Sequence, residues 1–205
     1  MNNILNYLDE MFPYPKCELN YNNDFELLIA IVLSAQTTDK RVNSVTKELF
    51  KKYPTAKELS NASISDIERI IMPVGTYKKK SVYINEIAKS LLFNNFVKIP
   101  ADRNYLETLP GVGRKTINVF LSEAYNIPNI AVDTHVFRVC KRLGITNEND
   151  DVLATEMVLM RKIKKVHWSK VHLQLVLFGR YHCKAIKPLC ENCKVIKSCL
   201  YYKKK

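Results

Sequence analysis

Apolar residues recur at intervals of three and four along most of the chain, a spacing that predicts amphipathic α-helices. Asp24 precedes the apolar segment 25–34, Asp39 precedes the periodic segment 40–50, and Ser63 with Asp66 has the pattern of a capping box. Further helices are expected at residues 78–93, 103–109, 115–125, 134–143, 151–160 and 167–180. No segment alternates like a strand, so the pattern predicts an all-α fold of about ten helices.

Composition and charge narrow the class of protein. The longest apolar run is residues 27–33, which is far shorter than the roughly 18 to 20 residues of a membrane helix. The acidic N-terminus has no pattern of a secretory signal, so we expect a cytoplasmic protein. The chain has 32 Lys and Arg against 20 Asp and Glu, a net charge of +12. This excess favours a polyanionic partner, although a lysine-rich solvated surface is the alternative interpretation.

Residues 109–116, LPGVGRKT, concentrate two of the five glycines of the chain. Pro110 stops the preceding helix, and Gly111 can adopt a left-handed conformation without steric cost. The bare N–H groups of such a turn, at the start of the next helix, bind phosphate. A helix C-cap without a ligand is one alternative. A nucleotide P-loop is excluded, because its motif, aligned on Lys115 and Thr116, requires glycine where Leu109 and Arg114 stand.

Four of the six cysteines lie close together near the C-terminus, in the pattern C-x6-C-x2-C-x5-C. They are Cys183, Cys190, Cys193 and Cys199. Without a secretory signal, this grouping favours a metal over disulfides. A zinc ribbon usually has two C-x2-C pairs, and only one is present, so the spacing modestly favours a [4Fe–4S] cluster. Cys17 and Cys140 stand apart and are expected to be free thiols.

The sequence resembles the helix-hairpin-helix DNA glycosylases, and within them the endonuclease III family. The resemblance runs through residues 25–39, residues 109–139 and the C-terminal cysteines, almost the whole chain. It implies a two-lobed all-α fold with a C-terminal [4Fe–4S] cluster loop at 183–199. It places a central helical domain at 17–127, with the helix-hairpin-helix at about 103–122, and a second lobe formed by 1–16 and 128–205.

The resemblance also assigns chemistry to two residues. It implies that Lys115 is the nucleophile and Asp133 the assisting carboxylate of an enzyme that excises oxidised pyrimidines from duplex DNA. A lysine amine that attacks C1′ of the sugar forms a Schiff base, from which β-elimination cuts the strand 3′ to the lesion. From the residues alone, Asp133 is more simply a helix N-cap and Lys115 a phosphate contact.

DNA contacts are implied on two further segments. The resemblance places a residue that fills the hole left by the flipped nucleotide at Gln36. A second wedge, often leucine in such relatives, corresponds to Thr76, which leaves its apolar contribution open. The candidate backbone anchor of the hairpin comprises Gly111, Val112, Gly113 and Arg114. The lysines at 78–80 are either further phosphate contacts or a solvated charge run.

Two other functions remain open at this point. A monofunctional glycosylase of the same superfamily would lack the nucleophilic lysine, and a non-enzymatic DNA-binding protein would use only the hairpin and the basic charge. The preferred interpretation is a bifunctional DNA glycosylase and AP lyase that acts as a monomer on double-stranded DNA and carries a structural [4Fe–4S] cluster.

Overall fold

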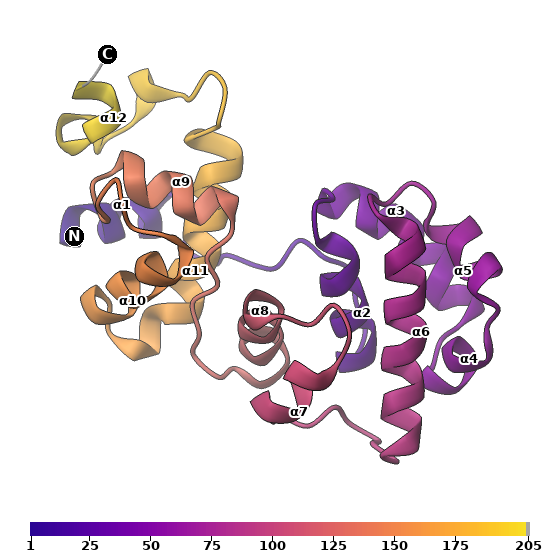
Figure 1. The fold of residues 1–205 in the computed structure, drawn as a ribbon. Coiled ribbons are helices and arrows are strands. Elements are labelled where there is room, and N and C mark those ends of the chain that lie inside the picture. The colour runs from indigo at the N-terminus through magenta and orange to yellow at the C-terminus, as the bar shows by residue number, and fades with distance from the viewer. Residues whose placement is uncertain (204–205) are drawn as a thin grey trace. The chain divides into compact units, whose positions relative to one another are not determined.

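A computed structural model of the chain describes residues 1–203. These residues form helices joined by short loops and contain no β-strand. The chain divides into two compact units, one made of residues 18–125 and the other of residues 1–17 with the chain from residue 126 onward. Figure 1 shows the helices of each unit by label. No helix among residues 1–203 is long and apolar enough to cross a membrane.

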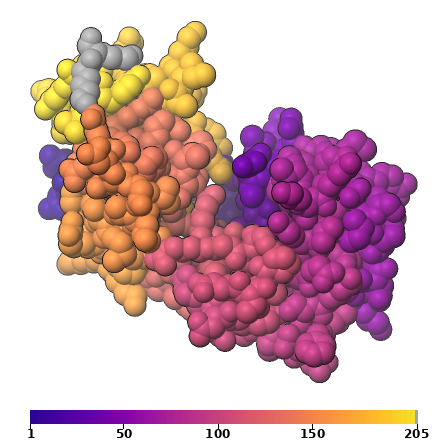
Figure 2. Space-filling view, in the orientation of Figure 1, coloured from indigo at the N-terminus to yellow at the C-terminus, as the bar shows by residue number. Residues whose placement is uncertain are grey.

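The unit formed by residues 18–125 is built around α2, which is buried on all sides from Phe25 to Leu33. Helix α8 packs against α2, and α6 packs against α4 and α5. In the space-filling view, the purple and magenta segments of this unit form one packed body (Figure 2). Its helices are α2 (Asp24–Ser34), α3 (Asp39–Lys52), α4 (Ala56–Asn61), α5 (Ile64–Ile71), α6 (Tyr77–Phe93), α7 (Arg103–Thr108) and α8 (Arg114–Tyr125).

The other unit packs α9 and α11 together and covers α11 with α1. Its core includes Leu8, Val136, Leu175 and Phe178. Its α-helices are α1 (Asn2–Met11), α9 (Thr134–Arg142), α10 (Val152–Lys162), α11 (Trp168–Leu177) and α12 (Leu200–Lys203). Short 3-10 turns lie at Lys165–His167, Cys190–Asn192 and Ile196–Ser198.

The helix expected over residues 167–180 is not one regular element. Helix α11 ends at Leu177 and continues as a π-helical turn over Phe178–His182. A Cβ atom added to Gly179 would lie 2.8 Å from the Cβ of His135 on α9. The absence of a side chain at Gly179 therefore allows the turn to approach α9 closely.

Two of the expected N-caps lie one residue earlier than the sequence pattern placed them. The side chain of Asn23, not Asp24, accepts a hydrogen bond from Glu26 N at 2.9 Å at the start of α2. Asp24 lies inside the helix, where its Oδ2 accepts from Ile99 N at 2.8 Å. Thr38 likewise caps α3 in place of Asp39.

Ser63 caps α5 by accepting from Asp66 N at 3.3 Å, but the reciprocal half of the expected capping box is wrong. The Asp66 carboxylate instead accepts from Lys52, Tyr53 and Arg69. Hydrogen bonds from Lys52 and Tyr53 lower the pKa of Asp66 to about 2. A full capping box does form at the start of α4, between Thr55 and Glu58.

The turn between α7 and α8 has the hairpin geometry expected for LPGVGRKT. Gly111 has φ +75°, and Val112 N donates to Leu109 O at 3.1 Å. A Cβ atom added to Gly111 would lie 2.6 Å from the ring of Tyr83 on α6. A Cβ atom at Gly113 would meet nothing within 4 Å. The turn therefore requires glycine at Gly111 both for its backbone conformation and for its contact with α6.

We predict that Gly111→Ala lowers the free energy of unfolding by about 1–3 kcal/mol, because alanine is strained at positive φ and overlaps the Tyr83 ring. Gly113→Ala is the matched control, with an expected change within about 0.5 kcal/mol. Urea denaturation followed by circular dichroism measures both values. Equal stability of the two variants would contradict the steric requirement at Gly111.

Candidate functional site

The hairpin residues are presented to solvent, apart from one that fixes the turn in the core. Gly111, Gly113, Arg114 and Lys115 are exposed, whereas Val112 is only 6% exposed. The buried side chain of Val112 and its N–H, which donates to Leu109 O, are therefore not available to a phosphate. Arg114 and Lys115 occupy the first two positions of α8, where the positive end of the helix dipole attracts an anion.

A buried hydrogen bond holds the two helices of the hairpin together. Arg103 Nη2 on α7 donates to Asn118 Oδ1 on α8 at 2.7 Å, and Asn118 is 1% exposed. The neighbouring apolar residues Leu106 and Ile117 are fully buried. The orientation of the α8 N-terminus is thus fixed by packing and by a charged hydrogen bond.

Gln36 and Thr76 lie on two loops that touch each other. Both residues are exposed and have left-handed backbones, with φ of 55° and 57°. Gly75 N donates to Thr37 Oγ1 at 3.3 Å, and a Cβ atom on Gly75 would lie 3.4 Å from Gln36 O. A left-handed conformation costs a residue with a side chain roughly 1–2 kcal/mol, so the contacts around these loops must offset strain.

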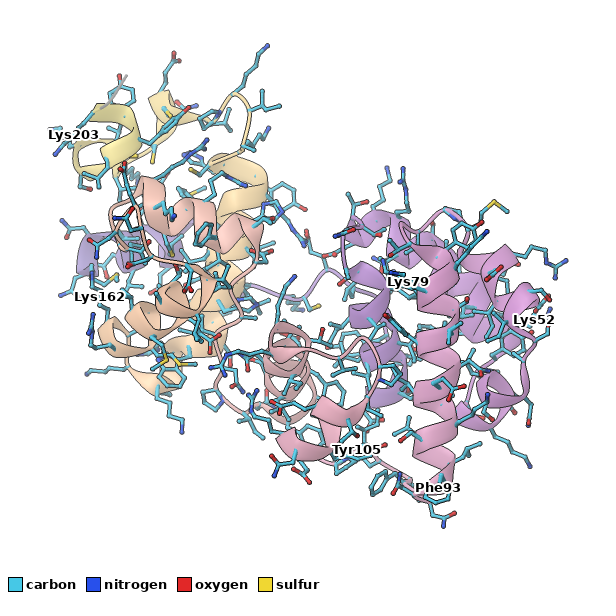
Figure 3. The ribbon with its side chains drawn as sticks, in the orientation of Figure 1. Lys52, Lys79, Phe93, Tyr105, Lys162 and Lys203 are labelled. Carbon is cyan, nitrogen blue, oxygen red and sulfur yellow. The ribbon has the colours of Figure 1, made fainter. Side chains whose placement is uncertain are left out.

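The three consecutive lysines at the start of α6 do not share one environment. Lys78 and Lys79 are exposed, and Figure 3 labels Lys79 at this end of the helix. Lys80 is 3% exposed, so its expected role as a phosphate contact or a solvated charge is wrong. Burial lowers the pKa of Lys80.

The sequence does contain a signal for the burial of Lys80. It stands four residues before Ile84 and seven before Ile87, on the buried face of α6. Its Nζ donates to Leu33 O at 2.9 Å and to Ala35 O, the carbonyls at the end of α2. Lys80 therefore occupies an apolar position of the helical period, although its place in a run of three lysines suggested that it would be exposed.

Asp133 is the N-cap of α9, as its position before an apolar helix indicated. Its Oδ1 accepts from Val136 N at 2.8 Å, and the side chain is half-buried. The cap holds the carboxylate in one orientation. Next to it, burial lowers the pKa of His135, an effect that the negative charge of Asp133 partly opposes and the charges of Arg138 and Arg180 reinforce.

The two predicted catalytic residues belong to different units of the chain. Lys115 lies in the unit of residues 18–125, and Asp133 lies in the unit that contains α9. Each is fixed by its own helix N-terminus, Lys115 in the first turn of α8 and Asp133 as the cap of α9.

The four clustered cysteines lie near one another in the unit that contains α9. Cys183 and Cys199 are buried, and Cys190 and Cys193 are half-buried. Burial raises the pKa of Cys193, and the charges of the other three thiolates raise it further. No three His, Cys, Asp or Glu side chains among residues 1–203 are arranged around a common metal position. Four thiols in one segment are the kind of donor set that an iron–sulfur cluster or zinc requires.

Arg142 organises the start of the cysteine segment, a role that no sequence pattern indicated. Its guanidinium donates to Lys184 O at 2.6 Å and Ala185 O at 3.0 Å and lies 4.1 Å from the ring of Tyr201. It also donates to Cys183 Sγ at 3.6 Å, which lowers the pKa of that thiol against the larger effect of burial.

Comparison with known proteins gives a consistent family. Residues 29–165 match the family described as "HhH-GPD superfamily base excision DNA repair protein". Endonuclease III of Bacillus subtilis is 46% identical over 195 residues, which cover 95% of this chain and 89% of that protein. Endonuclease III of Escherichia coli K12 is 40% identical over 201 residues, covering 98% and 95%.

Solved structures agree with these relatives. A trapped endonuclease III–DNA covalent intermediate superposes with a TM-score of 0.95 at 46% identity, covering 99% of this chain and 95% of that one. A thermostable thymine-DNA glycosylase at 22% identity has a TM-score of 0.82 and shows that the fold is shared more widely. By its motifs, its fold and its relatives over nearly the full chain, this protein belongs to the HhH-GPD superfamily of base excision DNA repair proteins and, within it, to the endonuclease III family.

Proposed function

We propose that this protein excises oxidised pyrimidines from duplex DNA and then cleaves the strand 3′ to the abasic site through a Schiff base on Lys115. The observation that carries the proposal is the exposed Lys115 in the first turn of α8, next to the glycine hairpin, in a chain similar over its full length to an endonuclease III trapped covalently on DNA. Its place of action would be the cytoplasm, as expected for a bacterial repair enzyme of this family.

The chemistry needs an amine and a carboxylate. Lys115 Nζ forms a bond to C1′ as the C1′–N bond breaks, and the base leaves with the bonding electrons and takes up a proton. The sugar ring opens to an imine between C1′ and Lys115. Loss of a proton from C2′ then expels the 3′ phosphate by β-elimination.

Asp133 would stabilise the positive charge that develops on the sugar as the base departs, as carboxylates do in glycoside hydrolysis. The hydrogen bond from Val136 N to Oδ1 holds the carboxylate in place, and Oδ2 would be the atom that faces the sugar. In this role, the helix cap and the catalytic carboxylate are the same group.

DNA binding would use the hairpin and the two touching loops. The exposed backbone of Gly111 and Gly113 and the N-terminus of α8 would offer an anion site for one backbone phosphate. Gln36 and Thr76 would enter the space left by the extruded nucleotide, where the short polar side chain of Thr76 covers less apolar surface than the leucine of many relatives.

The C-terminal cysteines would hold a [4Fe–4S] cluster. The ligands would be Cys183, Cys190, Cys193 and Cys199. When bound, the cluster would join iron to the four thiolates, and these bonds would order the segment. The segment carries exposed lysines at 184, 187, 194 and 197, which would then present positive charge to the DNA backbone. Glycosidic cleavage and β-elimination transfer no net electrons, so the steps assigned to Lys115 need no redox centre.

We also propose that the two units serve as the two lobes of the glycosylase, the central helical domain expected at 17–127 and the second lobe that carries the cluster. The protein would act as a monomer, since each chain contributes both Lys115 and Asp133.

Lys115→Ala is expected to abolish covalent trapping, because no imine can form without the amine. The measurement is borohydride trapping on a duplex oligonucleotide that carries thymine glycol, with a duplex that carries an abasic site as the second substrate. Lys47→Ala, which removes an exposed lysine of α3, should trap like the wild type. Trapping on the abasic duplex alone would support the lyase activity but not excision of thymine glycol, and other damaged bases would then be the substrates to test. If wild-type protein that binds DNA gave no trapped product on either substrate, the lyase mechanism would be refuted.

Asp133→Asn removes the negative charge of the side chain but keeps its ability to cap α9. Asparagine caps a helix about as well as aspartate, so the free energy of unfolding should change by less than about 0.5 kcal/mol. Base excision should slow by about 100-fold or more, because the carboxylate charge is lost. Single-turnover excision and urea denaturation measure the two effects. Excision at the wild-type rate would remove Asp133 from the mechanism.

Cys193→Ser is expected to lose the visible absorption of an iron–sulfur cluster and most of the bound iron, because the fourth thiolate is missing. Cys140→Ser is the matched control, since Cys140 lies outside the group and burial raises its pKa to about 12. Iron and zinc analysis of the purified proteins distinguishes the two metals. A wild-type protein that contains stoichiometric zinc and no iron would overturn the cluster assignment.

A further inference from the structure

The ammonium group of Lys80 lies buried where the loop that carries Gln36 contacts the loop that carries Thr76. Figure 3 shows the start of α6, where Lys79 is labelled, and the opposite end at Phe93. Lys80 Nζ donates to Leu33 O at 2.9 Å, to Ala35 O, and to Thr37 Oγ1 at 3.4 Å. All three acceptors belong to the end of α2 and the loop that follows it.

Thr37 Oγ1 connects this lysine to the second loop. The hydroxyl accepts from Gly75 N at 3.3 Å as well as from Lys80, and it lies 3.4 Å from Ala35 O. Gln36 is enclosed between two residues that Lys80 binds, and Thr76 follows the glycine that Thr37 binds. One buried ammonium group thus ties both left-handed residues to a common junction.

The charge of Lys80 is balanced by backbone dipoles. Among residues 1–203, no carboxylate forms an ion pair with its Nζ, and burial alone shifts its pKa. The carbonyls at the C-terminal end of α2 have no partners within the helix and carry its negative dipole end, so they are suited to a buried cation. A neutral residue in place of Lys80 would remove the donor to Leu33 O and leave Ala35 O only the long hydrogen bond from Thr37 Oγ1.

We propose that Lys80 is a positioning residue that holds Gln36 and Thr76 ready to fill the hole in the DNA stack. The proposal rests on the proposed function for the role of these two side chains. It implies that the loops are ordered before DNA binds, so that no ordering cost is added when the nucleotide is extruded. Chemistry at an abasic site in single-stranded DNA has no stack to fill and should not depend on Lys80.

The test compares Lys80→Met, which keeps an unbranched side chain as far as Cε and removes the donor, with Lys89→Met, which removes an exposed charge from the same helix. Excision of thymine glycol from duplex DNA should fall about 10- to 100-fold in Lys80→Met, since small misplacements of positioning groups have effects of that size. Cleavage of a single-stranded abasic oligonucleotide should stay within about 3-fold of wild type, which corresponds to less than about 0.7 kcal/mol. Lys89→Met should match wild type in both assays.

Hydrogen exchange gives a readout that does not depend on activity. The amides of residues 34–38 and 74–77 should exchange at least about 10-fold faster in Lys80→Met, while those of the hairpin at 109–114 should not change. Thr37→Val, which keeps the shape of the side chain, should show the same selective effects with smaller magnitude. It replaces Lys80→Met in the test if that variant does not fold.

Equal loss of both activities, or unchanged exchange in the two loops, would overturn the positioning role. Inactivity of the wild type on both substrates would refute the proposed function instead, and the exchange measurement would still decide whether Lys80 orders the loops.

Discussion

Burial of α2 on every side is the constraint on which the unit of residues 18–125 depends. Each fully buried Leu or Ile contributes about 1.5–3 kcal/mol relative to an exposed one, and α2 has an unbroken buried run from Phe25 to Leu33. The helix must end where its apolar run ends, and its last carbonyls then need donors inside the protein. Lys80 supplies them, so the packing of the core and the shape of the neighbouring loops are parts of one arrangement.

The same core positions the hairpin. Helix α8 packs directly on α2, and Gly111 packs against Tyr83, one turn after Lys80 on α6. The start of α8 with Lys115, the Gln36 loop and the Thr76 loop are therefore held by three helices that share one core. Groups that would grip the backbone, attack the sugar and fill the stack are all attached to rigid elements, which is what a reaction on an extruded nucleotide demands.

Most helices could be predicted because their apolar period is regular and their breakers are explicit, as Pro110 and Gly111 show at the hairpin. The failures have local causes. Asn23 and Asp24 both qualify as caps, and only tertiary contacts, here the bond from Ile99 N to Asp24, decide between them. The π-helical turn at Gly179 depends on the approach of α9, which no local pattern contains.

For the candidate site too, some features could be predicted from the residues and others could not. The turn geometry at Gly111 and the cap at Asp133 followed from residue chemistry, whereas the catalytic roles of Lys115 and Asp133 came only from the family resemblance and stay predictions. Lys80 was hidden in a run of three lysines, since charge runs are usually solvated, although its place on the buried face of α6 was readable. Arg142 could not be found, because its acceptors are backbone carbonyls more than forty residues away in the sequence.

The proposed chemistry requires that the amine of Lys115, and no other, becomes bonded to the sugar. The most direct measurement is proteolytic digestion of the borohydride-reduced complex, followed by mass spectrometry to locate the lysine that carries the sugar remnant. We expect a single modified peptide in which Lys115 bears the added mass. The adduct on another lysine, or spread over several lysines, would contradict it.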